Sequence, residues 1–305
     1  MNPSSHGRHE HGDIRLGTLV PGGPTTPRYI EAIAPHGFES FQITFGTQVG
    51  DVDLERLAGE VREVLARATP GAVISAVGVY GNPLMEAAVA ADWARLVDAA
   101  GAFGTDLVCG FAGRITNQPI PASLGRFAEV FGPLAQRAEE RGVRLAFENC
   151  NMEGTWEYGD WNIAHAPAAW EQMFERVPSP ALGLEWEPCH QLVSLVDPLP
   201  QLRAWLPRVF HIHGKDATVL WDVIRSRGLR GGEPYVLHRT PGFGDTNWTD
   251  LVSILRMGGW RGSIDIEGWH DPVYRDDLEM TGQVRALEYL RACRGGRYVP
   301  NPEVS

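Results

Sequence analysis

Residues 123–148 read SLGRFAEVFGPLAQRAEERGVRLAFE, in which a helix pattern runs directly into a strand pattern. Apolar side chains recur at Leu124, Phe127 and Leu134, the spacing of one face of a helix. Gly142 then ends the pattern, because glycine favours the position that follows a helix. The last five residues, RLAFE, form a short apolar run of strand length. The stretch therefore predicts one helix followed by one strand.

The same alternation runs through the chain. We predict strands at eight short apolar runs: Ile14–Val20, Ser40–Phe45, Ala72–Tyr80, Asp106–Phe111, Arg144–Glu148, Ala181–Glu187, Val209–His213 and Ser263–Glu267. We predict helices over five longer segments: Asp53–Ala68, Met85–Gly101, Ser123–Arg141, Asn247–Met257 and Asp277–Cys293. Strands that alternate with helices imply a parallel sheet with right-handed crossovers. Eight such units predict an α/β protein with a (β/α)8 TIM barrel.

An open, doubly wound sheet is the competing α/β fold. It would usually carry the phosphate-binding pattern G-x-G-x-x-G after its first strand. Residues 17–23 read GTLVPGG and lack that pattern, so the sequence favours the barrel. We expect a single barrel domain over residues 13–296, with tails at residues 1–12 and 297–305.

Composition excludes several classes of protein. Hydrophobic residues make up 43% of the 305 residues and charged residues 21%, which is typical of a globular protein and not of a disordered one. The net charge of −11 (27 − 38) argues against a nucleic-acid partner. There is no apolar run of 18 residues and no secretory signal, so we expect no membrane partner. The four cysteines form no CxxC pair, which predicts free thiols in a cytoplasmic protein.

Polar residues end each of the last four predicted strands, where barrel active sites lie. They are Glu148 and Asn149; Glu185, Glu187 and His190; His211, His213, Lys215 and Asp216; and Asp265, Glu267 and His270. Side chains alternate along a strand, so the last inward-facing member of each group lies nearest the rim. This rule selects one converging set as a metal site: Glu148, Glu187, His213 and Glu267.

Three carboxylates and a neutral imidazole suit one divalent metal, with Mn²⁺ first and Mg²⁺, Co²⁺ or Zn²⁺ as alternatives. A single glutamate at a strand end is more often a salt-bridge partner or a helix cap. Four ligating residues on successive strands favour a site. Cys150 and Cys189 adjoin the predicted ligands, and we expect both to pack behind the rim as small apolar groups.

Five segments carry a resemblance to a known family: FENCN, LEWEPCH, HIHGKDA, PGFGDTNW and GSIDIEGWHD. They resemble the sugar phosphate isomerase/epimerase superfamily of xylose-isomerase-like TIM barrels, and the similarity covers Ile14 to Cys293. The resemblance implies that the four selected residues hold the metal and that Glu148 and Glu267 also act as catalytic acid and base. It implies a substrate contact for His190, which we also expect to be a catalytic acid or base. Glu187 departs from the family, which usually has Asp at this position.

Successive predicted ligands are 39, 26 and 54 residues apart (187 − 148, 213 − 187, 267 − 213). The last interval exceeds one strand–helix unit, and the excess lies in Ala217–Asp245, which we expect to be an inserted loop (217–245) with substrate contacts or a subunit interface. We expect Lys215 to pair with Asp216 or to bind a substrate oxygen. The full set of expected substrate contacts is Asn149, His190, Lys215, His238, Arg239, Trp269 and His270.

A divalent cation that binds a sugar carbonyl acidifies the adjacent C–H, and flanking carboxylates can then move the proton. The chemistry predicts either a sugar isomerase/epimerase or a lyase that eliminates from a 3-oxo-glycoside. The segments HGKDA, HRTPGFGD and IEGWHDP are similar to the large subunit of bacterial C-glycoside deglycosidases. That resemblance implies a small β-sandwich partner subunit; otherwise we expect a homo-oligomer.

The sequence also bears on two other classes of protein. An endonuclease IV-like nuclease would need more histidine ligands and a basic DNA track, and the charge of −11 argues against it. A non-catalytic sugar-binding or scaffolding barrel would predict a missing ligand, whereas all four positions are filled.

Overall fold

A computed structural model describes residues 14–268, 270–296 and 302. The tails expected at residues 1–12 and 297–305 therefore lie outside the described residues, apart from Pro302. Trp269, an expected substrate contact, lies outside them as well.

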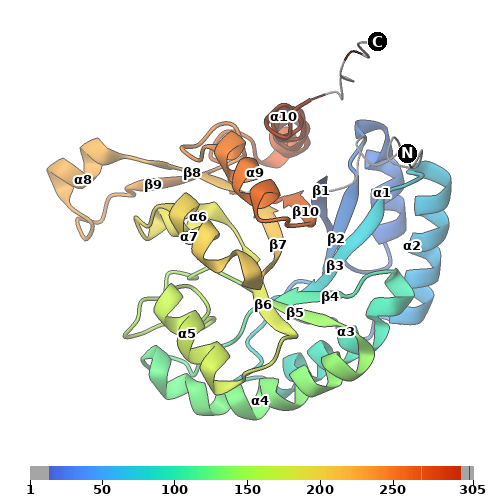
Figure 1. Ribbon diagram of the computed structural model, residues 1–305, viewed down its shortest axis with the longest axis horizontal. Helices are drawn as coiled ribbons and strands as arrows, with labels where there is room; N and C mark the ends of the chain where they lie inside the picture. The colour runs from blue at the N-terminus through green and yellow to red at the C-terminus, as the bar shows by residue number, and fades with distance from the viewer. Residues whose placement is uncertain (1–13, 269, 297–301, 303–305) are drawn as a thin grey trace.

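Eight parallel strands close into a barrel in the order β1-β10-β7-β6-β5-β4-β3-β2 (Figure 1). Their bounds are β1 Ile14–Pro21, β2 Ser40–Thr44, β3 Val73–Val79, β4 Leu107–Gly110, β5 Arg144–Glu148, β6 Leu182–Trp186, β7 Val209–Gly214 and β10 Gly262–Ile266. Each corresponds to one of the predicted apolar runs, and the (β/α)8 barrel is confirmed.

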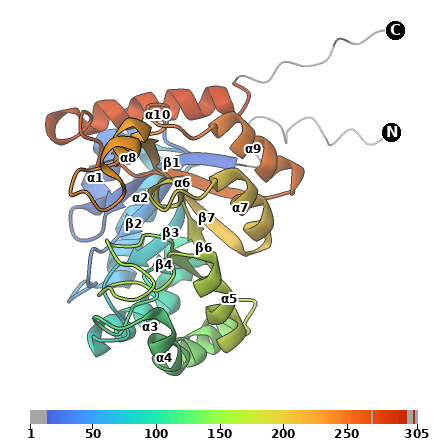
Figure 2. The same cartoon turned by 90° about the vertical axis from the view of Figure 1, so that its left-hand side faces the viewer.

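Helices surround the barrel in the order of the strands. Within the described residues they are α1 Thr26–Ile33, α2 Leu54–Ala68, α3 Ala87–Phe103, α4 Ile120–Arg141, α5 Pro167–Arg176, α6 Pro188–Val193, α7 Pro198–Trp205, α9 Trp248–Met257 and α10 Glu279–Cys293. Figure 2 shows α9 and α10 on one side of the barrel and α3 and α4 on the opposite side. The five predicted helices are present. The prediction missed α1, α5, α6 and α7, which have ten residues or fewer and so show little periodicity.

Helix ends follow local hydrogen bonding. The Asp53 side chain accepts a hydrogen bond from the backbone N–H of Arg56 at 3.0 Å and caps the start of α2. Gly142 ends α4 in the left-handed conformation (φ 66°), as predicted. The predicted end of α3 at Gly101 was wrong, because the helix continues to Gly104, which takes the left-handed conformation (φ 79°).

Aromatic packing outside the barrel orients β5. The Phe147 ring lies 4.8 Å from that of Phe131 on α4, which in turn lies 5.3 Å from that of Trp93 on α3. All three side chains are buried, and each contributes about 2 kcal/mol through the hydrophobic effect. Because neighbouring strand residues face opposite sides of a sheet, the outward Phe147 turns Glu148 toward the barrel axis.

The barrel interior is narrow near β1. Gly17 pairs in register with Asp265, and a Cβ atom at this position would collide with Ser40 and with the Asp265 carboxylate. Glycine therefore leaves room for a buried carboxylate inside the barrel. Polar side chains fill this interior and lead up to the candidate site described below.

Residues 216–239 form an arm that projects from the barrel (Figure 1). The antiparallel strands β8 Asp216–Val219 and β9 Val236–Arg239 make its base, and α8 Trp221–Arg227 lies at its tip. This arm occupies most of the expected insertion. No helix among the described residues is both long and apolar enough to cross a membrane.

Candidate metal centre

Four ligating side chains meet at the carboxyl ends of β5, β6, β7 and β10. They are Glu148, Glu187, His213 and Glu267, and one ligand atom from each lies within 4.8 Å of those from the others. Their relative exposures are between 0% and 5%. The structure thus brings together the whole set that was selected from the sequence, and these groups could hold a metal ion.

Several atoms of this centre have no hydrogen-bond partner among the described residues. They are both carboxylate oxygens of Glu187, Nδ1 of His213 and Oε2 of Glu267. His213 Nδ1 lies 3.2 Å from Glu267 Oε2 and 3.4 Å from Glu148 Oε1. Buried polar atoms without partners are costly unless something binds them. Oxygen and nitrogen atoms that face one another in this way fit a divalent cation.

Electrostatics also favour a cation. Burial and the neighbouring carboxylates raise the pKa of Glu148 to about 7 and that of Glu187 to about 8. Burial likewise raises the pKa of Glu267, but Lys215 and His213 outweigh it and hold the value well below its usual range. Burial lowers the pKa of the His213 ring, yet the surrounding carboxylates hold it well above its usual value. Two of the three carboxylates thus resist ionisation in the absence of further positive charge, which a divalent metal would supply.

Lys215, the only lysine in the chain, is buried beside this centre. Its Nζ donates to Oε1 of Glu267 at 2.7 Å. The expected pairing with Asp216 was wrong, because the Asp216 carboxylate accepts hydrogen bonds from the Trp248 indole at 2.9 Å and from the Thr246 backbone at 3.1 Å. Asp216 instead ties the base of the arm to the start of α9.

Three histidines beside the centre range from buried to exposed, and we call them the mouth of the centre: His190, His238 and His270. The ring centroid of His238, on β9 of the arm, lies 5.3 Å from that of His190 and 5.8 Å from that of His270. Burial and Lys215 lower their pKa values to about 3 for His190 and His238 and about 4 for His270. All three are therefore neutral near pH 7. His190 also touches the metal centre, with Nε2 2.7 Å from Oε1 of Glu187.

Arg239 and Asp271 fasten the arm to the loop after β10. The Arg239 guanidinium donates to the Asp271 carboxylate at 3.1 Å, and the same carboxylate accepts from the Thr240 backbone at 2.8 Å. The structure thus places Arg239 near the mouth with its charge already paired.

Asn149 is fully buried and binds the backbone of Glu187, the candidate ligand that follows the next strand. Its amide donates to the backbone carbonyl of Glu187 at 2.9 Å and accepts from the backbone N–H of Glu187 at 2.7 Å. Both bonds hold the backbone that carries the Glu187 side chain. These contacts give Asn149 a positioning role, in contrast to the substrate contact expected from the sequence.

A layer of polar residues lies below the centre, and only Glu185, His211 and Asp265 of this layer were named from the sequence. Gln42 on β2, Tyr80 after β3 and Glu185 on β6 form hydrogen bonds behind His213. Deeper still, His211 pairs with Asp265, which also accepts from Ser40 and Ser75. The available signal was a polar residue at an inward position of an otherwise apolar strand, as Gln42 is in SFQIT.

The buried cysteines carry their protons. Burial raises the pKa of the thiols of Cys109, Cys150 and Cys189 well above its usual value. Cys109 and Cys150 each lie near a carboxylate and an imidazole that could share a metal with the thiol. Cys189 precedes His190 in the sequence. Because a protonated thiol is a poor ligand, the oxygen-rich set remains the stronger candidate.

The sequence model of the xylose isomerase-like TIM barrel family matches residues 30–293. The chain belongs to this family. A xylose isomerase domain protein from Planctomyces limnophilus has 18% sequence identity and a TM-score of 0.69, with 92% of this chain and 97% of that chain covered. The 3-keto-D-glucoside 4-epimerase from E. coli has 15% identity and a TM-score of 0.68, with 92% and 100% covered.

A curated relative gives a sequence match as well. Inosose dehydratase from Bacillus thuringiensis is 22% identical over 173 residues, which cover 56% of this chain and 54% of that protein. The chain thus spans about half the length of the curated relatives it matches. The resemblance to xylose-isomerase-like barrels is confirmed by these comparisons.

Proposed function

We propose that the chain is a divalent-metal-dependent enzyme that moves a proton beside the carbonyl group of a sugar. The carrying observation is the convergence of four buried ligating side chains whose facing atoms lack other partners. The similar proteins support this chemistry, since one is named an epimerase of a keto-glucoside and another a dehydratase of an inosose. Both names fit reactions that begin at a C–H beside a carbonyl.

The residues divide into ligands, proton carriers and substrate contacts. Glu148, Glu187, His213 and Glu267 would hold the metal, Mn²⁺ first and Mg²⁺, Co²⁺ or Zn²⁺ as alternatives. When bound, the metal polarises the carbonyl and acidifies the adjacent C–H. Glu148 and Glu267 approach His213 Nδ1 from β5 and β10, so one can remove the proton and the other can return one.

The charges at the mouth indicate an uncharged substrate. Lys215 is paired with Glu267, and Arg239 is paired with Asp271. The three histidines of the mouth are held neutral. Neutral imidazoles bind hydroxyl groups well, whereas a phosphate would call for an unpaired cation. We therefore propose a free sugar or a glycoside, with hydroxyl contacts from His190, His238 and His270.

The arm favours a second candidate reaction, elimination from a 3-oxo-glycoside. It places His238 beside His190 at the mouth, and a neutral imidazole of this kind can donate a hydrogen bond to a leaving group. The exposed indole of Trp221 on the arm offers a flat surface for an aromatic aglycone or for a partner subunit. Elimination and epimerisation share the first proton abstraction and differ in the step that follows.

Exchange in D₂O with Mn²⁺ separates these candidates. The substrates are free ketohexoses and a 3-oxo-glucoside of a flavonoid. Deuterium beside the carbonyl of a ketohexose, with an epimer or isomer formed, would support the first reaction. Release of the aglycone without ketohexose turnover would support elimination. Binding of sugar without either product would contradict both and favour a non-catalytic barrel.

Glu267→Gln tests the assignment of the metal centre. We expect weaker Mn²⁺ binding and loss of turnover, because the amide is a poorer ligand and cannot act as a base. Glu63→Gln, at an exposed position on α2, is the matched control and should keep both properties. A Glu267→Gln protein with full metal content and full activity would contradict the assignment.

A further inference from the structure

We infer that Glu185, held by Gln42 and Tyr80, is a positioning residue that fixes the His213 ring with Nδ1 toward the metal. The inference rests on the proposed function, because it concerns a ligand of the proposed metal. It adds three residues from inside the barrel that the ligand set does not include.

Two hydrogen-bond acceptors face the rear nitrogen of His213. Nε2 lies 2.8 Å from Oε1 of Gln42 and 3.0 Å from Oε1 of Glu185. The front nitrogen, Nδ1, faces the carboxylates of Glu148 and Glu267. The ring therefore stands between an interior network and the candidate metal centre, with one nitrogen on each side.

The hydrogen-bond partners of Gln42 determine the orientation of its side-chain amide. Its NH₂ group donates to Oε1 of Glu185 at 2.5 Å and to the Tyr80 hydroxyl at 2.6 Å. Tyr80 in turn donates to Oε2 of Glu185 at 2.8 Å. The reversed amide would place its oxygen against the Glu185 carboxylate and lose the hydrogen bond to it. The oxygen of Gln42 must therefore face His213.

The tautomer of His213 follows from this arrangement. Since Gln42 and Glu185 both present acceptors, Nε2 must carry a hydrogen. In the neutral ring the lone pair is then on Nδ1, the atom that faces the metal centre. The Glu185 carboxylate also makes the imidazole a stronger donor to a cation, as carboxylates behind metal-bound histidines do.

Burial makes this arrangement rigid. Gln42 and Glu185 have no exposed surface and His213 has 1%. Glu185 also lies 3.1 Å from Nδ1 of His211, so its carboxylate is held on several sides. Rotation of the His213 ring would break both rear contacts inside a packed barrel. The metal thus meets a ligand whose orientation is set before it binds.

Mn²⁺ titration of the purified protein tests the inference. We expect Glu185→Gln to raise the Mn²⁺ dissociation constant about 10- to 100-fold, the usual effect of losing a carboxylate behind a histidine ligand. Gln42→Met keeps the Glu185 charge, removes only the amide contacts and should weaken binding by a smaller factor. This second variant covers the case in which Glu185→Gln does not fold.

A spectroscopic readout separates positioning from general damage to the core. The visible absorption of bound Co²⁺ reports ligand geometry, and we expect saturated Glu185→Gln and Gln42→Met proteins to differ from the wild type. Asp92→Asn is the matched control, because Asp92 on α3 is a buried carboxylate that accepts from the Val49 backbone and from Arg95 and, within the described part of the chain, has no contact with the residues around His213. It should leave both the Mn²⁺ affinity and the Co²⁺ spectrum unchanged.

The outcomes are distinguishable. A wild-type protein that binds no divalent metal would overturn the proposed function itself. Normal binding by the wild type, with equal affinity and an equal spectrum for both test variants, would overturn only the inference. Equal losses in the Asp92→Asn control would also overturn it, because the effect would then reflect general damage to the protein.

Discussion

The ammonium group of Lys215 lies 2.7 Å from Oε1 of Glu267 and 3.9 Å from Oε1 of Glu187, inside the candidate metal centre. These carboxylates raise the pKa of Lys215 well above its usual value despite its burial, which lowers it. The only lysine in the chain is thus a charged group that balances two buried carboxylates. A divalent cation would neutralise part of the negative charge of these carboxylates.

Lys215→Met should destabilise the metal-free protein by about 3 kcal/mol, since it leaves buried carboxylates without a partner. Mn²⁺ should restore more stability to this variant than to the wild type, because binding to the folded state stabilises it. Thermal unfolding with and without Mn²⁺ measures both effects. Arg126→Met, which removes an exposed ion pair with Glu129, should change little. Equal behaviour of the two variants would contradict this role of Lys215.

Asn149→Ala should weaken Mn²⁺ binding about tenfold, because the backbone of Glu187 loses both hydrogen bonds that hold it. Unfolding in urea should also show a loss of about 1–3 kcal/mol from the unpaired backbone groups. Asn82→Ala is the control, since Asn82 is buried and bonds the backbone of Arg114, away from the ligands. We expect it to lose stability but to keep its metal affinity; a matching loss of affinity would show that the effect is not local.

His165 should make the stability of the protein depend on pH. Burial lowers its pKa from 6.5 to about 4. Between these values the unfolded chain binds a proton that the folded chain does not, so stability falls as the pH falls from 6.5 to 4 and changes little above 6.5 through this group. The full effect is about 3 kcal/mol.

Urea unfolding at pH 7.5, 5.5 and 4.5 checks this expectation. His165→Asn should flatten the decline between the first and last pH values. His36→Asn, at an exposed position, is the control and should follow the wild type. A decline of the same size in the His165→Asn protein would rule out His165 as the cause.

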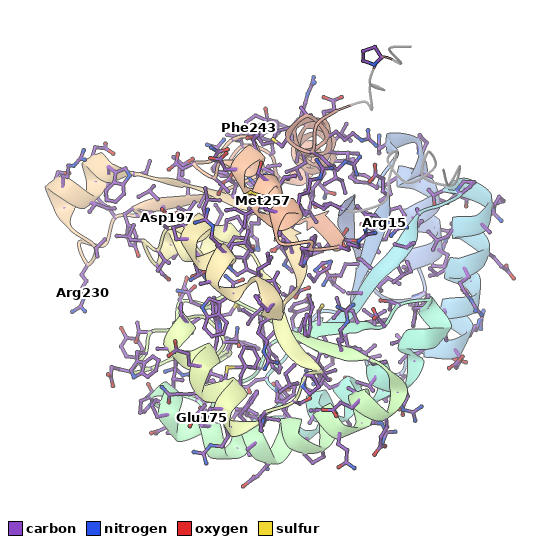
Figure 3. The ribbon with its side chains drawn as sticks, in the orientation of Figure 1. Arg15, Glu175, Asp197, Arg230, Phe243 and Met257 are labelled. Atoms are coloured by element: carbon purple, nitrogen blue, oxygen red, sulfur yellow. The ribbon has the colours of Figure 1, made fainter. Side chains whose placement is uncertain are left out.

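The arm should act as a contact between copies of this chain. Trp221 and Leu229 are about half exposed on it, at 50% and 51%, and Arg230 points away from the barrel at its tip (Figure 3). Exposed apolar side chains on a projecting element favour association. We expect light scattering to give a larger mass for the full chain than for a variant in which a two-residue turn replaces residues 221–234.

The shortened variant keeps β8 and β9 and with them His238, so its Mn²⁺ affinity should not change. Met257→Asp is the control, because Met257 is 77% exposed on α9, away from the arm, and its variant should keep the mass of the full chain. A full chain that scatters as a monomer would contradict the expectation, and a mass that rises only with a second, small protein would point to a hetero-oligomer.

The local pattern of the sequence was sufficient for the fold and for the candidate ligands. Strand runs such as RLAFE alternate with helix segments, and this periodicity depends only on neighbouring residues. Glu185 and Glu187 share a parity along their strand, as do His211 and His213, so nearness to the carboxyl-terminal rim selected Glu187 and His213. Short helices such as α6 were not predicted, because six residues are too few to show the periodicity of apolar side chains along a helix.

The sequence by itself determined a parallel barrel and the residues that end its strands, since both follow from spacing along the chain. Only the tertiary structure decided the partners of those residues. It brought Gln42 within 2.8 Å of His213, 171 residues away, and it paired Lys215 with Glu267 in preference to its neighbour Asp216. Closure of the barrel sets these distances, because strands far apart in sequence become neighbours around one axis and share a single narrow interior.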